Sequence, residues 1–287
     1  MPRFLIVTAD DFGLHTAVNE AVERASRTGI LTAASLMVAE AAAPDAVRRA
    51  RELPDLRVGL HVVLADGHSV LPPARIPALV DTQGRFGDRM FVDGVRFFAL
   101  PRVRRQLEQE IRAQFEAFRA TGLRLDHVNA HKHFHLHPTL LAMLLKVGRD
   151  YGLEQAGVRV PAQPRWSSQA ALLLAPWVAV MKHRLRAAGV ASNDHLFGVA
   201  DSGRMTEGRL LQILAHLPQG ISEIYLHPGT QSGSVIAPSM QEYRHTDELA
   251  ALMSPQVRAL MASLTATDVE CGGFSDLARA GWRRHAA

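Results

Sequence analysis

Four histidines alternate with other residues in one short segment of the chain. His131, His133, His135 and His137 follow the apolar, strand-like run 123–129. In an extended segment, residues two apart project to the same face, and the neutral imidazole is the commonest metal ligand in proteins. We predict that one or two of these histidines bind a metal ion, and that the others contact substrate or support the ligands through hydrogen bonds. A fortuitous histidine-rich tract is the alternative.

Further candidate ligands lie in two other strand-like segments. Asp10 and Asp11 follow the apolar run 3–8, and His61 lies within the apolar run 57–64. Adjacent carboxylates can divide their tasks, one binding a metal while its neighbour acts as a base. A histidine among apolar residues is costly to bury unless a partner satisfies it. Taken alone, the two aspartates also fit a turn, and His61 also fits a core histidine.

His227 is a candidate proton donor. It precedes Pro228-Gly229 at the end of the strand-like run 221–226, and an imidazole titrates close to working pH. A cap before a Pro-Gly turn is the alternative. The chain has one cysteine, so a metal must be held by histidine and carboxylate. It contains no His-Glu-x-x-His, Gly-x-Ser-x-Gly or Walker A motif, so serine or cysteine catalysis has no local signature.

The elements that must position these residues alternate between strand and helix. Expected strands cover 3–8, 31–38, 57–64, 123–129, 158–160, 195–199 and 221–226. Expected helices cover 16–27, 44–53, 102–121, 138–151, 169–188 and 206–217, and a helical pattern over 247–264 is broken near Pro255. This alternation predicts parallel βαβ units in an α/β fold. A distorted or incomplete (β/α) TIM-like barrel fits better than an open sheet, because no Gly-x-Gly-x-x-Gly follows the first strand.

The length fits one domain. The chain has 287 residues, and barrels of this kind commonly form a single domain of about 250 residues. We expect one domain over 1–287. Residues 65–100 break the alternation and are rich in Pro and Gly. A structureless loop of this length is unusual inside a compact domain, so we expect an insertion near the site.

Charge and hydropathy indicate a cytoplasmic protein. The net charge is +4, and its excess lies in two clusters, Arg102, Arg104 and Arg105, then Arg279, Arg283 and Arg284. These clusters fit solvated helix faces or, alternatively, anionic lipid or phosphate. Aromatic residues do not interleave with them, so we expect no nucleic acid. The N-terminal apolar stretch is too short for a signal peptide, and the longest apolar run, 170–181, is below the ~20 residues that span a bilayer.

The order and spacing of these segments resemble the YdjC-like (ChbG-type) carbohydrate deacetylases, to about residue 274. The segments that carry the resemblance are Thr8-Ala9-Asp10-Asp11-Phe12-Gly13, Gly59-Leu60-His61, the tract beginning at His131, and His227-Pro228. Within them, 31–38 (LTAASLMV) and 126–137 (DHVNAHKHFHLH) are similar to the hopanoid-biosynthesis-associated branch, called HpnK.

The resemblance implies a distorted barrel of NodB/YdjC-like deacetylase architecture with one divalent metal ion, Zn²⁺ or Mg²⁺. It implies that Asp11, His61 and His131 hold the metal. The implied reaction removes an N-acetyl group from an amino sugar through a metal-activated water. Relatives of the ChbG type carry Asp-Ser-His where this chain has Asn129-Ala130-His131.

The resemblance also implies roles around the metal. Asp10 is the implied base, and His227 matches the histidine that protonates the departing amine. We assign His133, His135 and Arg159 to substrate binding or to hydrogen bonds that support the ligands. The implied substrate is an N-acetylglucosaminyl hopanoid, a glycolipid.

Several alternatives stay open at this point. The apolar segments 90–100 and 170–181 could cover a lipid tail or pack as core. A soluble chitooligosaccharide could replace the lipid-linked substrate. A metal-independent glycoside hydrolase would pair Asp10 with another carboxylate, and a metal-buffering module would use the histidine tract alone. A homodimer, and contact with the inner face of the membrane, are further alternatives for a cytoplasmic protein.

Overall fold

The strands form one curled sheet in which every registered pair is parallel. The computed structural model describes residues 3–163 and 169–277. The sheet order is β5-β4-β3-β2-β1-β7-β6, and β8 also pairs with β1. The strands are β1 (Arg3–Phe12), β2 (Ala33–Leu36), β3 (Arg57–Val62), β4 (His127–Ala130), β5 (Gly157–Val158), β6 (His195–Phe197), β7 (Gly220–Leu226) and β8 (Val269–Cys271).

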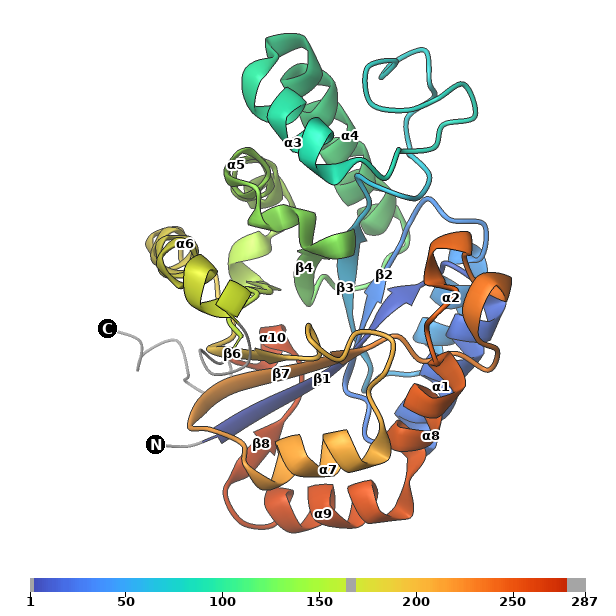
Figure 1. The fold of residues 1–287 in the computed structure, drawn as a ribbon, viewed down its shortest axis with the longest axis vertical. Coiled ribbons are helices and arrows are strands. Elements are labelled where there is room, and N and C mark those ends of the chain that lie inside the picture. Colours follow the sequence, from blue (N-terminus) through green and yellow to red (C-terminus); the bar gives the residue numbers. More distant parts are fainter. Residues whose placement is uncertain (1–2, 164–168, 278–287) are drawn as a thin grey trace.

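Helices surround the sheet on its outside (Figure 1). The α-helices are α1 (Thr16–Thr28), α2 (Ala43–Arg51), α3 (Met90–Ala99), α4 (Pro101–Ala120), α5 (Pro138–Gly148), α6 (Gln169–Ala187), α7 (Glu207–Ala215), α8 (His245–Met253), α9 (Pro255–Thr265) and α10 (Phe274–Leu277). Short 3₁₀ helices are η1 (His131–Leu136), η2 (Arg149–Tyr151), η3 (Leu153–Gln155), η4 (Gly233–Val235) and η5 (Pro238–Met240). The predicted alternation of strands and helices is confirmed. No helix within 3–163 and 169–277 is long and apolar enough to cross a membrane.

The two edge strands approach each other without a regular ladder. The backbone N–H of Val158 in β5 donates to the carbonyl of Ala191, which precedes β6, at 2.9 Å. The side chain of Asn193 then bonds both backbone groups of Val160, at 2.7 and 2.8 Å. An amide side chain thus takes the place of a missing strand pair. The prediction of a distorted or incomplete barrel is confirmed.

β1 lies at the centre of the sheet. Every residue of β1 after Arg3 is buried, which is typical of a parallel strand covered on both faces. β1 pairs with β7 without interruption from Arg3 to Ala9. Its pairing with β2 shifts register between Ala9 and Phe12. A shift of this kind changes the directions in which neighbouring side chains point, and here it falls on Asp10 and Asp11.

The insertion at 65–100 contains one helix, α3, and is otherwise loop. Three buried polar side chains of α4, spaced by four residues, hold the loop: Gln106, Glu110 and Gln114. The Glu110 carboxylate accepts the backbone N–H groups of Val70 at 2.8 Å and Leu71 at 3.0 Å. Burial raises the pKa of Glu110, although these hydrogen bonds lower it.

The single-domain organisation over 1–287 stays a prediction. The cluster Arg279, Arg283 and Arg284 lies outside the described residues.

We expect Glu110→Ala to loosen this loop. The change leaves the amides of Val70 and Leu71 without their acceptor, and an unsatisfied buried donor costs about 1–3 kcal/mol. Hydrogen exchange at 68–86 should accelerate, as measured by mass spectrometry. The matched control is Gln109→Ala on the exposed side of the same helix, which should leave exchange unchanged. Equal protection in both variants would show that Glu110 does not hold the loop.

Candidate active site

Asp10 and Asp11 occupy the irregular end of β1. Asp11 has a left-handed backbone, with φ of 63°, which is uncommon for a residue with a side chain and is found at functional sites. Its carbonyl accepts the N–H of Leu14 at 3.0 Å, and the N–H of Gly13 donates to Asn19 at 2.8 Å. The turn therefore holds Asp11 in this conformation. Both aspartates are almost completely buried.

His61 reaches the site from β3, opposite Asn129 of β4. The two residues are register partners, and Asn129 Oδ1 accepts a hydrogen bond from His61 Nδ1 at 2.6 Å. Because Nδ1 carries the proton in this bond, Nε2 of His61 is left with a free lone pair, as a metal ligand requires. Asn129 thus orients a candidate ligand.

The histidine tract is not extended, so the prediction that its histidines share one face is wrong. β4 ends at Ala130, and the chain turns at once into η1, where Lys132 and His133 have φ of 53° and 54°. The side chain of His135 folds back to accept the N–H of Ala130 at 3.1 Å. Among the described strands, β5 pairs with β4 up to Val128 and β3 pairs with it up to Ala130, so these strands do not hold the chain extended beyond Ala130.

The predicted metal ligands bring three donor atoms together. Asp11 Oδ1 lies 3.3 Å from His61 Nε2 and 3.1 Å from His131 Nδ1, and the two ring nitrogens are 3.4 Å apart. Donors around a tetrahedral zinc ion, at bond lengths of about 2.0 Å, are roughly 3.3 Å apart. Asp11 Oδ2 is buried and has no hydrogen-bond partner among the described residues. The cluster of Asp11, His61 and His131 could therefore bind a metal ion.

Asp10 is held by a buried arginine. Arg159 is fully buried, and its Nη1 and Nη2 donate to the two carboxylate oxygens of Asp10, the latter at 3.0 Å. On its other side, Arg159 donates to Glu223 at 2.8 and 3.0 Å. Burial raises the pKa of Asp10, but Arg159 and His61 outweigh it and lower the pKa far below its usual range. Asp10 is therefore an ionised acceptor, and Arg159 lies behind it without access to solvent.

A second set of hydrogen bonds reaches Asp10 from β2 and β4. Ser35 Oγ donates to Asp10 Oδ1 at 2.8 Å, and Asn129 Nδ2 donates to Ser35 Oγ at 2.9 Å. The ring of His127 lies between Ser35 and Asp126, 2.9 Å from each. The backbone of Gly59 faces this ring, since a Cβ there would lie 2.5 Å from its atoms. The glycine of the Gly-Leu-His segment therefore makes room for His127.

His227 follows β7 and faces Asp11. Its Nε2 lies 4.0 Å from Asp11 Oδ2. The backbone N–H of His227 donates to Glu248, and its carbonyl accepts from Nδ1 of His245. Burial lowers the pKa of His227, although the negative charges of Asp11 and Asp10 raise it. Burial also raises the pKa of Glu248 to about 7.

The remaining histidines of the tract lie away from the three donor atoms. His133 Nε2 lies 3.0 Å from the hydroxyl of Tyr225, and the guanidinium of Arg159 lies over the same ring at 4.8 Å. His135 is fully buried, and burial lowers its pKa to about 3. His137 packs edge-on against Phe97. The assignment of His133 and His135 to substrate binding, or to hydrogen bonds that support the ligands, stays a prediction.

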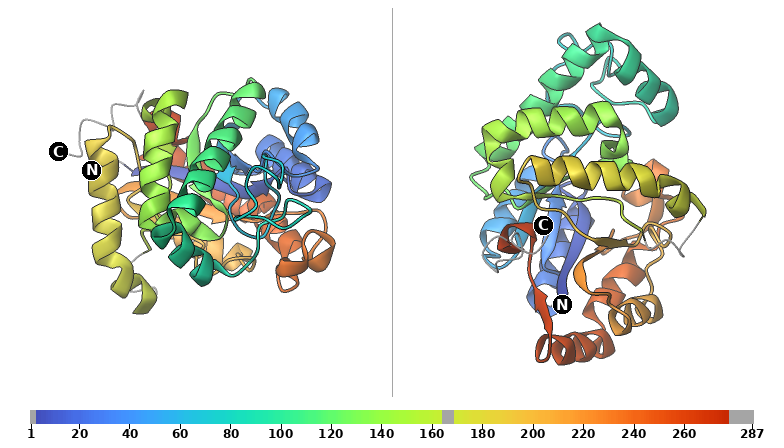
Figure 2. Two further views of the ribbon diagram at one scale, coloured as in Figure 1. Left: turned by 90° about the horizontal axis from the view of Figure 1, so that it is seen from above. Right: turned by 90° about the vertical axis from the view of Figure 1, so that its left-hand side faces the viewer.

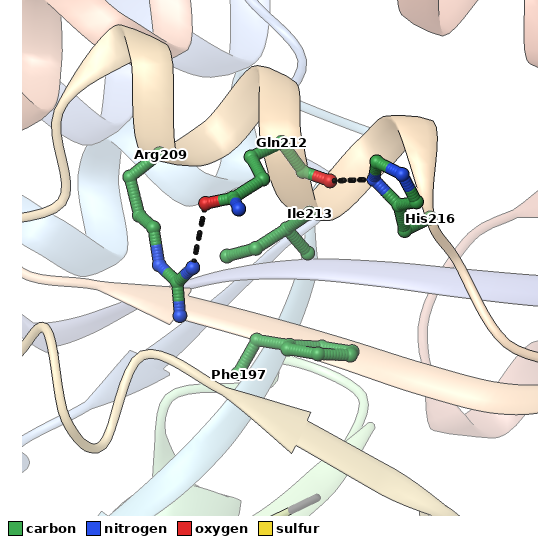
Figure 3. A pocket seen from close by; sticks show the side chains of 5 residues that line it. All are labelled: Phe197, Arg209, Gln212, Ile213 and His216. Atoms are coloured by element: carbon green, nitrogen blue, oxygen red, sulfur yellow. Dashed lines mark hydrogen bonds between the residues drawn. The ribbon is translucent and has the colours of Figure 1, made fainter. Parts of the chain in front are cut away.

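A separate cavity of about 260 Å³ lies between α7 and β6 (Figure 3). Its polar groups satisfy each other, because Arg209 donates to Gln212 Oε1 at 2.8 Å and His216 Nδ1 donates to the Gln212 carbonyl at 2.9 Å. None of its lining residues belongs to the cluster around Asp11. It offers no candidate site.

Sequence reasoning missed four polar residues of the site. These are Ser35, Glu223, Glu248 and His245. Ser35 and Glu223 lie within strands β2 and β7, where a polar side chain in an apolar run requires a buried partner. That signal is visible in the sequence, but the partner is not. Glu248 and His245 belong to α8, where polar residues are unremarkable.

The chain is similar to known proteins along most of its length. A family described as YdjC-like protein matches residues 4–263. A carbohydrate deacetylase of Brevibacillus brevis is 32% identical over 257 residues, covering 88% of this chain and 92% of that protein. A carbohydrate deacetylase of Geobacillus stearothermophilus is 31% identical over 264 residues, covering 91% and 94%.

A solved structure shares the fold. It is described as a cellobiose-phosphate cleavage protein of Enterococcus faecalis V583, with a TM-score of 0.76 at 22% identity, and the match covers 96% of this chain and 99% of that one. At this identity the likeness concerns the fold alone. From the family match over most of its length, together with the two relatives, the chain belongs to the YdjC-like protein family.

Proposed function

We propose that the protein is a metal-dependent carbohydrate deacetylase that removes the N-acetyl group from an amino sugar. The observation that carries this proposal is the convergence of Asp11, His61 and His131 within 3.1–3.4 Å of one another. Asp10 precedes Asp11 in the sequence, and His227 Nε2 lies 4.0 Å from Asp11 Oδ2. We assign Asp10 as the base and His227 as the acid for amide hydrolysis. The names of the two bacterial relatives support the same activity.

The chain's own groups then divide the work. Asp11, His61 and His131 would hold a divalent metal ion, which would supply Lewis acidity for a carbonyl oxygen and would lower the pKa of a bound water. The ionised Asp10 accepts the proton of the attacking water. His227, with its ring 4.0 Å from Asp11, donates a proton to the departing nitrogen. Burial of all these groups keeps the electrostatic interactions strong.

Arg159, Ser35 and Asn129 position the base. Arg159 and Ser35 donate to the Asp10 carboxylate, so the rotation of this side chain is restricted. Asn129 connects Asp10 and Ser35 to His61. One amide therefore sets the orientation of both the base and a metal ligand. Fixed orientation of this kind lowers the cost of reaching the reactive geometry.

Two alternatives fit the site less well. A glycoside hydrolase needs one carboxyl group that stays protonated as general acid, but the pKa values of Asp10 and Asp11 are both lowered, by Arg159 and by His131 against the effect of burial. Burial raises the pKa of Glu248 to about 7, but both of its carboxylate oxygens accept backbone N–H groups, of Met205 and of His227. A metal-buffering module would use several histidines of η1 as ligands. His133 and His135 are instead directed to Tyr225 and to backbone.

We further propose an N-acetylglucosaminyl hopanoid as the substrate. This assignment rests on the similarity of 31–38 and 126–137 to the hopanoid-associated branch. Within these segments lie Ser35, His127 and Asn129, which line the interior beside Asp10. The similarity therefore concerns residues that support the site as well as those that could bind the metal.

Replacing each aspartate should separate metal binding from proton transfer. Asp11→Ala removes a ligand, so we expect metal content and activity to be lost together. Asp10→Asn keeps the ligands and removes the base, so metal content should persist while kcat falls by about 10²–10⁴-fold. Plasma mass spectrometry of purified protein and a deacetylation assay measure the two effects. Near-normal turnover of Asp10→Asn would show that the base is misassigned.

The dependence of kcat/KM on pH should change when the positive charge of Arg159 is removed. Removing its charge raises the pKa of Asp10, so the acid limb of kcat/KM should move to higher pH. Arg159→Met is best combined with Glu223→Gln, since the single change leaves a buried carboxylate uncompensated and costs about 3–5 kcal/mol of stability. Glu223→Gln alone is the matched control and should leave the limb in place. An unshifted limb in the double variant contradicts the role of Asp10 as the titrating base.

Substrate choice is tested by comparing two acetylated compounds. We expect kcat/KM for N-acetylglucosaminyl hopanoid, presented in mixed micelles, to exceed that for a soluble chitooligosaccharide by at least about tenfold, or 1.4 kcal/mol. Release of acetate measures both reactions. Efficient deacetylation of the soluble compound would count against the lipid-linked substrate while leaving the deacetylase chemistry intact.

A further inference from the structure

Exposed large apolar side chains gather on two helices. Among the described residues nine such side chains are exposed, and all but Val235 lie in two segments. The α3 patch comprises Val92, Val95, Phe98 and Leu100, and the α6 patch comprises Leu172, Leu173, Leu174 and Val180. Leu173 is 81% exposed and Phe98 is 68% exposed. Soluble monomers rarely expose apolar side chains in groups, so these patches need a partner.

Both helices pack against η1, the segment that begins at the metal-ligand candidate His131. The inner face of α3 contacts η1 through Phe97, whose ring centre lies 5.3 Å from that of Phe134. α6 contacts it through Trp177, which donates to the Leu136 carbonyl at 2.7 Å. Figures 1 and 2 show α3, α5 and α6 along one flank of the molecule. The two patches are therefore the outward faces of helices fixed to the same short segment.

The exposed charge that follows both patches along the chain is positive. No acidic residue occurs from 94 to 107 or from 155 to 193. The α3 patch is followed by the exposed Arg102, Arg104 and Arg105, and the α6 patch by the exposed Arg184 and Arg186. Asp93, at the edge of the α3 patch, is paired with Arg96 at 2.9 Å. Each apolar patch is thus followed along the chain by exposed positive charge, and the exposed Asp88 is the acidic residue that precedes the α3 patch.

This combination selects among the surfaces that could cover the patches. A helix that lies in a membrane interface buries an apolar face roughly 5–10 Å deep while basic residues contact anionic lipid. A second copy would form a two-fold interface from the same surface on both chains, which brings the arginines of both copies together. We propose that the α3 and α6 patches dock on an anionic lipid bilayer, with the apolar side chains among the lipid headgroups and the arginines on lipid phosphates.

This docking goes beyond the proposed reaction, because it concerns where the protein works. It would fix the side of the molecule that carries η1 at the bilayer, with α3 and α6 between η1 and the lipid. The docking itself requires neither the metal nor the deacetylase activity.

Vesicle sedimentation with purified full-length protein tests the proposal. The probes are vesicles of phosphatidylcholine alone and of equal parts phosphatidylcholine and phosphatidylglycerol. We expect binding to the anionic vesicles at least about tenfold tighter than to the neutral ones, and weakening as salt screens the arginines. Absence of wild-type binding to anionic vesicles overturns the proposal.

Two sets of variants locate the surface. Phe98→Asp with Leu173→Asp should lower vesicle binding at least about tenfold, because each change places a charge in the apolar face. Val235→Asp, at an exposed apolar position outside both patches, is the matched control and should bind as wild type does. Replacing Arg102, Arg104 and Arg105 by Glu should weaken binding to anionic vesicles roughly a hundredfold or more. Thermal unfolding checks that each variant is folded.

The alternative occupant gives a different result. Sedimentation velocity measures whether wild-type protein is a dimer and whether the Phe98→Asp and Leu173→Asp variant is a monomer. If wild type dimerises through the patches and does not bind vesicles, the surface joins two copies and the proposal is wrong. Vesicle binding by a protein that deacetylates no substrate would instead leave this proposal standing and refute the proposed function.

Discussion

The site depends on one buried charge, the guanidinium of Arg159. It is fully buried between Asp10 and Glu223 and donates to both. A charge removed from water is costly unless partners satisfy it, and here four hydrogen bonds to two carboxylates and the ring of Tyr225 surround it. Because Arg159 keeps Asp10 ionised, it also sets the proton affinity of the candidate base. Stability and proposed chemistry therefore rest on the same ion pair.

A chain of hydrogen bonds extends this constraint to the metal-ligand candidates. Asn129 contacts Asp10, Ser35 and His61, so one side chain connects β1, β2, β3 and β4. His127 extends the chain to Asp126, which also accepts hydrogen bonds from Ser275 near the end of the described chain. The interior of the curled sheet is thus polar along one path. A buried polar network is stable only when its members have hydrogen-bond partners. The polar residues of these strands are therefore found where they can bond one another.

The histidine tract shows how local pattern and tertiary structure can disagree. Alternation by two indicates an extended segment, yet η1 is a 3₁₀ turn with two left-handed residues. His131 remains at the site because it follows β4 directly. His133 turns to Tyr225 and His135 to the backbone of Ala130. The same turn supplies the platform on which α3 and α6 rest, so the outward faces of these helices are fixed relative to the site.

The sequence alone determined the parallel α/β order, the positions of Asp10, Asp11, His131 and His227 near strand ends, and that of His61 within a strand. These follow from periodicity and from the rule that parallel strands deliver their carboxyl ends to one side of a sheet. The grouping of Asp11, His61 and His131 as candidate ligands came from the resemblance to the YdjC-like deacetylases. Tertiary structure alone decided that Arg159 lies behind Asp10, that Asn129 orients His61, and which apolar side chains face outward. The physical reason is that these facts depend on partners distant in the chain, whose identity no local pattern encodes.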